Sequence, residues 1–439
     1  MGALTKAVLI VLAISFMTLV AFFGRLPALR HTPIAWLHRA IWVSIPGAVF
    51  ALDQRLTSGR LTTGLGSFCH YIMYGRHPTV LIFFVLLLSV SEYMYLPGVW
   101  PRLGALNQVA GSIAISLPYL FLYLAAHGDP GVITPATHAR YMSHYPYDFA
   151  LFHPGHTCRT CSLLKPPRSK HCSVCQRCVH RMDHHCVFIN NCVGYGNQHW
   201  FLLLLLSTAT LTAYGAALGL RTVADYARTR NPKFVLFPKP PGWSWREYIM
   251  LATFGIQVDV GVGSVTLLAL MTSPLIWGLL GYHLYLIYCG TTTNESMKWQ
   301  DWQLEMDDGC AFRRALPANR VKNPRLEAPL ARWPVEAIQV LVRTEDGTPP
   351  TAAADGSVPP GAGEWERVWR LRDVENLYDL GFWDNLADIF LPDPFGSRSA
   401  LDAAMAAAPA DLERGKRRTN KRRPKVSRVA KSAVPAAAS

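Results

Sequence analysis

The fold of this chain is decided by residues 200–220, which read WFLLLLLSTATLTAYGAALGL and contain no Asp, Glu, Lys or Arg. Residues 108–126 and 261–289 also contain none of these four residue types. A run of about 18 or more such residues can cross a hydrocarbon core roughly 30 Å thick. In the whole chain of 439 residues, 50% are hydrophobic and 16% are charged. This composition favours an integral membrane protein over a soluble or disordered one.

Two more apolar runs lie nearer the N-terminus. Residues 7–23 follow Lys6 and are themselves followed by Arg25 and Arg30. The heavier positive charge after the run predicts an uncleaved anchor helix with its N-terminus in the lumen and its C-terminal flank in the cytosol. Residues 79–96 form the next expected span, because tyrosines and a tryptophan near its end suit a membrane interface.

Five crossings that start in the lumen would divide the chain into regions on alternating sides of the membrane. Loop 25–77 carries six Arg and one Asp, as the positive-inside rule predicts, but residues 221–262 also carry six Lys or Arg on the expected lumenal side. The expected regions are an anchor helix (1–24), a cytosolic loop (25–77), two transmembrane helices (78–126), a cytosolic cysteine-rich domain (127–198), a transmembrane helix (199–221), a lumenal loop (222–262), a last transmembrane helix (263–289), a cytosolic C-terminal region (290–395) and a disordered basic tail (396–439).

Residues 34–51 are ambiguous between a helix lying on the membrane and a further span. They are apolar, but His38, Arg39 and Pro46 interrupt them. An apolar segment interrupted in this way favours an interfacial helix, so we count it within the cytosolic loop.

The formal net charge of +14 is concentrated in the tail. Ten basic residues and no acidic ones lie between Arg414 and Lys431, and without them the net charge falls from +14 to +4. A Lys/Arg block followed by an Ala/Pro-rich end predicts a disordered, solvated extension, and attraction to anionic lipid is the alternative. The charge is therefore not a sign of nucleic-acid binding by the body of the protein.

Seven of the ten cysteines fall between Cys158 and Cys192. Such a cluster indicates disulfides in an oxidising compartment or a metal in a reducing one. The topology puts the cluster in the cytosol, where disulfides do not persist and cysteines two residues apart suit a tetrahedral zinc ion. The expected fold class is a polytopic α-helical membrane protein of about five transmembrane helices, with a cytosolic cysteine-rich domain for two zinc ions inserted between spans.

The cluster offers more ligands than two zinc ions need. Two tetrahedral sites take eight ligands, whereas the stretch has seven cysteines and four histidines, so a pair of Cys3His sites leaves one cysteine free. The run Asp183-His184-His185-Cys186 sets a thiol beside a possible base and a carboxylate that can orient the base, as covalent catalysis requires. Two interpretations stay open at this point, an enzyme with a nucleophilic cysteine and a structural zinc module with a buried spare cysteine.

This part of the sequence resembles the Asp-His-His-Cys protein S-acyltransferases, or palmitoyltransferases. The matching motif reads Cys158-x2-Cys161-x3-Lys165-Pro166-x-Arg168-x2-His171-Cys172-x2-Cys175-x2-Cys178-x4-Asp183-His184-His185-Cys186-x5-Cys192-x4-Asn197-x3-Phe201. Three outlying family motifs occur in the right order, namely Asp129-Pro130-Gly131, Thr292-Thr293-x-Glu295 and an aromatic C-terminal element with Tyr378, Gly381 and Asn385. One departure is Val187-Phe188, where many relatives have Pro-Trp.

The resemblance implies how the cluster divides between metal and chemistry. Cys186 would be the nucleophile, His184 its base and Asp183 the partner that orients the base. Two structural zinc ions are implied, with the ligand sets Cys158, Cys161, His171, Cys178 and Cys172, Cys175, His185, Cys192.

Other residues take supporting roles in the same resemblance. Thr293 is expected to hydrogen-bond near Asp183, and Asn385 is expected to tie the C-terminal element to the cysteine-rich loop. Three basic side chains are expected to contact the phosphates of coenzyme A, namely Lys165, Arg168 and Lys170. The alternative is that they form only a solvated basic surface.

The resemblance implies a two-step transfer of a long-chain acyl group, expected to come from palmitoyl-CoA, through a thioester on Cys186. The five-span layout is similar to a fungal branch of the family that acts on transmembrane SNAREs in the endoplasmic reticulum. The expected partners are acyl-CoA, the lipid bilayer and single-span membrane proteins such as SNAREs with cysteines next to the membrane. No nucleic-acid partner is expected.

A transporter fits the sequence less well. Apart from Glu92 and His283, the core spans hold almost no ionisable groups, whereas such groups usually mark an ion pathway. We expect His283 to be a hydrogen-bonded packing residue. A nucleic-acid-binding zinc protein fits poorly too, because fingers fixed between two spans cannot freely enter a groove.

Overall fold

The computed structural model forms two compact units, Met1–Val80 and Leu81–Ser439, which are described one at a time. The residues that it describes are 16–17, 20, 32–317, 319–351 and 359–391. The anchor expected over residues 1–24 lies outside the described residues except at three positions, and the tail expected over 396–439 lies outside them altogether.

The first unit is helical wherever its backbone is regular. It contains α2 (Pro33–Arg39), the π-helical stretch η2 (Ala40–Ser44), α3 (Ile45–Thr57) and α4 (Arg60–Tyr74). The first three run on into one another, and the resulting 25-residue helix is long and apolar enough to cross a membrane. The sequence favoured an interfacial helix over residues 34–51. That preference stays a prediction, because length and composition fit either placement.

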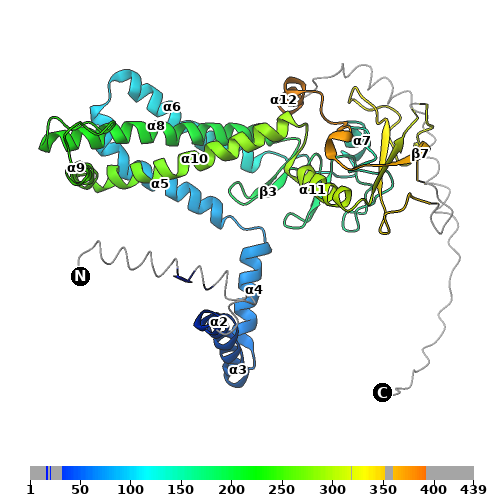
Figure 1. The fold of residues 1–439 in the computed structure, drawn as a ribbon, viewed down its shortest axis with the longest axis horizontal. Coiled ribbons are helices and arrows are strands. Elements are labelled where there is room, and N and C mark those ends of the chain that lie inside the picture. Colours follow the sequence, from blue (N-terminus) through cyan, green and yellow to red (C-terminus); the bar gives the residue numbers. More distant parts are fainter. Residues whose placement is uncertain (1–15, 18–19, 21–31, 318, 352–358, 392–439) are drawn as a thin grey trace. The chain divides into compact units, whose positions relative to one another are not determined.

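Four long helices form the membrane part of the second unit (Figure 1). Helix α8 packs against both α6 and α10. Together with Pro33–Thr57 they make five candidate spans in the described part of the chain, which confirms the expected polytopic helical fold, although the expected anchor is not among these five. The four helices are α5 (Thr79–Val99, continued by the 3-10 turn η3, Trp100–Arg102), α6 (Ala105–His127), α8 (Gln198–Arg230) and α10 (Val260–Tyr288).

The membrane helices approach one another through small residues and shared polar groups. A Cβ atom added to Gly219 of α8 would clash with Thr266 of α10, so glycine permits the close crossing. Tyr95 of α5 donates a hydrogen bond of 2.5 Å to the carbonyl of Gly215 in α8. These contacts hold the helices without relying on a hydrophobic driving force, which is absent between apolar surfaces in lipid.

The expected lumenal loop 222–262 is largely helical. Helix α8 continues to Arg230, beyond the expected boundary at residue 221, and α9 (Trp245–Val258) occupies much of the remainder. Helix α9 begins with a capping box, in which the Ser244 side chain accepts from Glu247 N–H and the Glu247 carboxylate accepts from Ser244 N–H. The sequence predicted one Pro-rich loop over these residues, but all of its prolines precede Ser244, where helix α9 is capped.

The cysteine-rich region between α6 and α8 consists of two short antiparallel hairpins and the small helix α7 (His138–Met142). The first hairpin pairs β1 (Lys170–Cys172) with β2 (Arg177–Val179), and the second pairs β3 (His184–Cys186) with β4 (Asn191–Val193). Regions with so little regular structure usually need additional cross-links, and metal sites commonly supply them in small domains.

The C-terminal region adds a small sheet that the sequence did not predict. The antiparallel strand order is β6-β5-β7, so the middle strand is the first in the chain. An aromatic core around Tyr145, Trp333 and Tyr378 joins this region to the segment before the first hairpin. The elements are α11 (Thr293–Asp307), β5 (Ala311–Ala315), β6 (Gln339–Arg343), β7 (Ala362–Arg367), the 3-10 turn η4 (Leu371–Asp373) and α12 (Phe382–Phe390).

The expected orientation predicts which of two asparagines can carry a glycan. The one N-x-Ser/Thr sequence of the chain starts at Asn294, on the expected cytosolic side, and should stay unmodified. The double substitution Pro232→Ala with Lys233→Thr makes Asn231, between α8 and α9, an acceptor on the expected lumenal side. Expression with endoplasmic-reticulum membranes should then give one endoglycosidase-sensitive mass shift for the variant and none for the parent. A mass shift for the parent and none for the variant would contradict the expected orientation.

Candidate active site and metal centres

The first hairpin and the Cys158–Cys161 segment before it bring together one group of four side chains that can bind a metal ion. His171 of β1 lies directly opposite Cys178 of β2. Its Nδ1 is 3.4 Å from the sulfur of Cys161 and 3.5 Å from that of Cys158, and Cys161 N–H points at the Cys158 sulfur at 3.4 Å. The four ligand atoms lie within 4.8 Å of one another, so the group can hold a metal ion.

The second hairpin repeats this arrangement. His185 of β3 lies opposite Cys192 of β4, and its Nδ1 is 3.4 Å from the sulfur of Cys175 and 3.7 Å from that of Cys192. Cys172 completes the group. Three sulfurs and one imidazole nitrogen form the donor set in each case, which is a set that structural zinc takes in tetrahedral geometry.

The alternation of side chains along a strand directs the metal-ligand candidates and the Cys186 thiol to different faces of β3. Successive residues of a strand point to opposite faces. In β1, His171 therefore joins the first metal group while Cys172 joins the second. In β3, His185 joins the second group, and its neighbours His184 and Cys186 share the other face. The order Asp-His-His-Cys thus puts one histidine into a group that can hold a metal ion and the other beside the free thiol.

The Asp183 carboxylate holds His184 in place. Its Oδ2 is 2.5 Å from His184 Nδ1 and accepts a 2.8 Å hydrogen bond from the Thr293 hydroxyl, while Oδ1 accepts one of 2.7 Å from Thr293 N–H. Thr293 was expected near Asp183, and it begins α11, directly after the last membrane helix. The loop and the end of α10 are therefore joined at the carboxylate that orients the imidazole.

The electrostatics of the cluster favour an ion pair between imidazole and thiol. Burial would raise the pKa of the Asp183 carboxyl, but the hydrogen bond and charge of His184 hold it below its usual value. Burial opposes charge on His184, yet hydrogen bonds to Asp183 and Cys186 raise its pKa to about 9. Burial would likewise raise the pKa of the Cys186 thiol, and the hydrogen bond from His184 and its charge lower it instead. A thiol in this setting is a stronger nucleophile at neutral pH because more of it is ionised.

The Cys186 thiol faces the apolar end of the helix bundle. It is only 9% exposed and belongs to a cluster that includes Leu122 of α6, Phe201 of α8 and Leu280 of α10. Side chains of α5 and α12 pack against the same cluster. The thiol therefore lies where an extended hydrocarbon chain can stay among apolar side chains.

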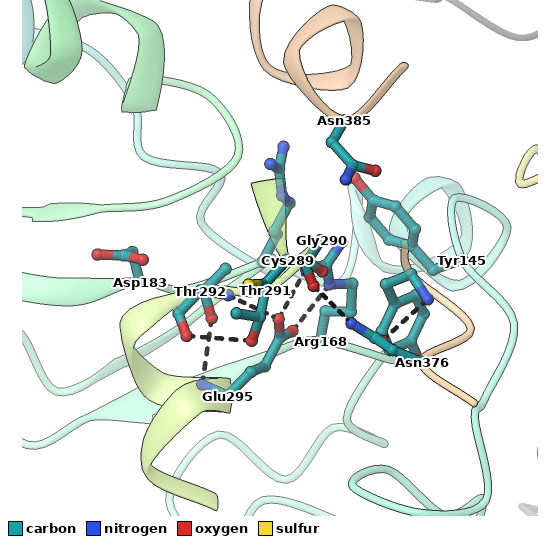
Figure 2. Close-up of polar contacts among 12 residues, drawn as sticks. Tyr145, Arg168, Asp183, Cys289, Gly290, Thr291, Thr292, Glu295, Asn376 and Asn385 are labelled. Carbon is teal, nitrogen blue, oxygen red and sulfur yellow. Dashed lines mark hydrogen bonds and ion pairs between the residues drawn. The ribbon is translucent and has the colours of Figure 1, made fainter. Parts of the chain in front are cut away.

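Arg168 corrects one expectation from the sequence. Its charge was expected to face solvent and to meet phosphate, but the residue is 2% exposed. Figure 2 shows it directed at Glu295, whose carboxylate accepts from Arg168 Nε at 2.8 Å and from Nη2 at 2.6 Å. The rings of Tyr378 and Tyr145 flank the guanidinium. The sequence could not reveal this partner, because only the fold brings the buried Glu295 carboxylate to Arg168.

The two expected lysines do lie toward solvent. Lys170 is exposed and Lys165 is half-buried. They are joined by a third, Lys298 of α11, which sequence reasoning missed. Burial lowers the pKa of the Lys298 ammonium, the carboxylates of Glu295 and Asp148 raise it, and the nearby charges of Lys170 and Lys165 lower it. Its ammonium lies 3.8 Å from the centre of the Phe152 ring. These three lysines form one basic surface beside the cysteine-rich region.

Asn385 ties the C-terminal element to the last membrane helix instead of to the cysteine-rich loop. Its Nδ2 donates to the carbonyl of Ile287 at 2.9 Å and to Asp379 at 2.8 Å. The link to the loop is made by Asp388 of α12, which accepts from Arg181 at 3.1 Å and from the Tyr145 hydroxyl at 2.5 Å. Asp388 carries no local sequence signal, since its partners are far away in the chain.

Comparisons with known proteins agree on one family. The family model described as DHHC palmitoyltransferase matches residues 151–300, which include both metal groups and the Asp183–Cys186 run. Palmitoyltransferase SWF1 of Neurospora crassa is 55% identical over 402 residues, which cover 89% of this chain and 93% of that protein. Palmitoyltransferase swf1 of Schizosaccharomyces pombe is 31% identical over 391 residues, which cover 88% and 96%. Palmitoyltransferase ZDHHC4 of Mus musculus is 34% identical over 338 residues, which cover 74% and 80%.

The buried position of Arg168 predicts a loss of stability when it is replaced. Arg168→Gln leaves the Glu295 carboxylate buried without its partner, which should cost about 3–5 kcal/mol in the free energy of unfolding. Arg343→Gln is the matched control, because that guanidinium is 68% exposed in its pair with Glu305 and should contribute less than about 1 kcal/mol.

Denaturant unfolding of the detergent-solubilised protein measures both variants. Adding Glu295→Gln to the Arg168→Gln variant should recover part of the loss, since no unpaired charge is then left in the interior. An Arg168→Gln protein of unchanged stability with weakened coenzyme A binding would contradict the buried role.

Proposed function

We propose that this chain, which belongs to the DHHC palmitoyltransferase family, works through a thioester on Cys186. It is a protein S-palmitoyltransferase with several membrane-spanning helices. The observation that carries this mechanism is the division of the cluster. Of the seven cysteines between residues 158 and 192, all of them described, Cys186 alone belongs to neither metal group. It lies instead beside His184, which Asp183 orients.

We assign one zinc ion to each Cys3His group. Structural zinc supplies folding energy to small domains, which is the chemistry it would contribute here. The protein's own part is to supply the ligands, from the two hairpins and from the Cys158–Cys161 segment before them, so that β3 is anchored through His185 while His184 and Cys186 stay free. Loss of the second ligand group should therefore disorder the strand that carries the nucleophile.

The first step forms the acyl-enzyme. His184 takes the proton of the Cys186 thiol, and the thiolate sulfur attacks the carbonyl carbon of the acyl-CoA thioester. The bond between that carbon and the coenzyme A sulfur breaks, and the departing thiolate takes the proton back from His184. Asp183 keeps the imidazole in the tautomer that can accept the proton, and it stabilises the imidazolium that forms.

The second step returns the enzyme to its starting state. The acceptor thiol loses its proton to His184 and attacks the acyl carbon, and the bond to the Cys186 sulfur breaks. The Cys186 thiolate then recovers the proton. Both steps exchange one thioester for another, so they are close to balanced in free energy and their rate depends on positioning.

Two surfaces support palmitoyl-CoA as the donor. The apolar cluster around Cys186 can take the acyl chain, and keeping a chain out of water is worth about 0.8 kcal/mol per CH₂. The surface formed by Lys165, Lys170 and Lys298 supplies positive charge for the phosphates of coenzyme A. The proposed coenzyme A-binding residues are therefore Lys165, Lys170 and Lys298, whereas the buried Arg168 is not among them.

The expected topology suggests which proteins receive the acyl group. With the cysteine-rich region in the cytosol, Cys186 lies close to the cytosolic end of the span that begins at Gln198. A cysteine next to the cytosolic end of another transmembrane helix is held at the same depth and in the same bilayer. We propose single-span membrane proteins, with transmembrane SNAREs foremost, as substrates in the endoplasmic reticulum.

The assigned roles of the cysteines predict three different phenotypes. Cys186→Ser should abolish labelling by radioactive palmitoyl-CoA and keep about two zinc ions per chain, because all eight ligands remain. Cys161→Ser should lose about one zinc ion and destabilise the region. Cys289→Ser is the matched control, since Cys289 is a free cysteine at the end of α10 outside both groups, and it should keep both labelling and zinc. Loss of zinc from Cys186→Ser, measured by elemental analysis, would make Cys186 a ligand and end the proposal.

Substrate selection by depth predicts a dependence on distance. In reconstituted bilayers, moving the acceptor cysteine of a single-span substrate about ten residues away from the membrane should sharply reduce its acylation, because confinement no longer raises its effective concentration at Cys186. Inserting the same residues on the lumenal side of the substrate helix should change little. Equal acylation of all three substrates would show that a separate docking surface selects them.

A further inference from the structure

His283 is an unusual residue for its position. It is the one Asp, Glu, Lys, Arg or His in α10, and ionisable groups inside membrane helices are rare and tend to be functional. The residue is 3% exposed, and its ring lies 5.7 Å from the ring of His184 and 5.1 Å from that of Phe201. The proposed transfer mechanism does not use it. The sequence predicted a packing residue, yet its nearest polar neighbours belong to the reactive cluster.

The side chains around His283 form a metal-ligand set of their own. One carboxylate oxygen of Asp183, one ring nitrogen of His184 and one of His283 lie within 4.8 Å of one another. Asp183 and His283 are buried and His184 is half-buried. None of the three belongs to either Cys3His group, so this set is separate from the structural sites.

We propose that Asp183, His184 and His283 form a third metal site, which binds Zn²⁺ reversibly and blocks acyl transfer while it is filled. Two imidazoles and one carboxylate are ligands that zinc commonly takes, with a fourth position left for water or another donor. The Cys186 thiol forms a hydrogen bond with His184, one of the three proposed ligands. Binding would therefore involve the groups that the transfer reaction needs.

The surroundings of Asp183 suit a ligating carboxylate. Ligating side chains are usually held by further hydrogen bonds, which fix their orientation and strengthen metal binding. Thr293 supplies two such bonds, from its N–H to Oδ1 and from its hydroxyl to Oδ2. His283 is fixed as well, because it projects from a long helix and packs against Phe201. Binding requires His184 to move, so that its Nδ1 exchanges the hydrogen bond to Asp183 for the metal.

The expected affinity is lower than that of the structural sites. Each Cys3His group has three thiolates, whereas the third set has none among its three members. Filling it also requires breaking the hydrogen bond between His184 and Asp183, which measures 2.5 Å. The third zinc ion should therefore exchange with buffered zinc under conditions in which the other two stay bound.

Inhibition follows from what the metal does to His184. A metal held by Asp183 and His184 replaces the hydrogen bond through which Asp183 orients the imidazole. The ring is then no longer held in position beside the Cys186 thiol. This consequence rests on the proposed role of His184 as the base, whereas metal binding rests on geometry alone.

Metal stoichiometry tests the site directly. The full-length protein in detergent, dialysed against buffered zinc, should bind about three zinc ions per chain, and His283→Gln should bind about two. His283→Cys should again bind three, because a thiolate replaces the lost ligand. His127→Gln, at an exposed histidine that ends α6, is the matched control and should bind three. Retention of the two structural ions and a single peak in size-exclusion chromatography show that each variant is folded.

Acylation of Cys186 supplies the second readout, as the ratio of rates with and without added zinc. The zinc concentration that halves the wild-type rate should rise roughly tenfold or more in His283→Gln, and it should stay near the wild-type value in His283→Cys and His127→Gln. Equal zinc binding by wild type and His283→Gln would overturn the site. Binding that requires His283 but leaves the rate unchanged would overturn the inhibition and the role of His184 as the base. Absence of Cys186 labelling in the zinc-free arm would instead refute the transfer mechanism.

Discussion

The buried ion pair between Arg168 and Glu295 is the contact on which the active-site geometry depends. Glu295 also accepts the Thr292 N–H at 2.9 Å, so the same carboxylate closes the N-terminal turn of α11 (Figure 2). Fixing that turn fixes Thr293, whose N–H and hydroxyl hold Asp183. A charged pair removed from water has a high desolvation cost, and two tyrosine rings beside the guanidinium offset part of it. The intact pair therefore adds little net stability, although removing one partner is costly, and its main role is to fix the positions of the residues around it.

The membrane sets the second constraint, because the cysteine-rich region is held at both ends by helices. Asn191 of β4 donates to the carbonyl of Gly128 at 2.9 Å, and Asn197 donates to that of Ala125 at 3.1 Å, so two amides cap the end of α6. A Cβ at Gly194 or Gly196 would clash with the backbone of the Asp-Pro-Gly turn that follows α6. The strand that carries Cys186 therefore cannot move away from the end of the helix bundle, which keeps the proposed nucleophile beside the membrane helices.

The residues themselves predicted what depends on local spacing and missed most of what depends on distant partners. Cysteine spacing is a property of a few consecutive residues, so a two-zinc cluster with one spare cysteine could be predicted from it, and the fold class followed from apolar runs. The division into two ligand groups and the contact between Thr293 and Asp183 were implied by the family resemblance instead. Arg168 looked like a surface charge because Glu295 lies more than a hundred residues away, and Lys298 and Asp388 gave no signal for the same reason. The sheet of β5, β6 and β7 was missed because its strands are short and separated by long connections, so no hairpin turn announces their pairing.

The proposed metal ligands and the proposed catalytic residues are of the same side-chain types, so the structure has to keep the two uses apart. Strand alternation does so within β3, where His185 faces a metal group and His184 faces the thiol. Asp183 adds a second barrier, because the hydrogen bond that orients His184 also occupies the nitrogen through which that ring would bind a metal. His283 weakens this barrier by offering another nitrogen from the membrane side. An apolar residue there would have protected the base from zinc, and the imidazole therefore makes the reactive cluster sensitive to it.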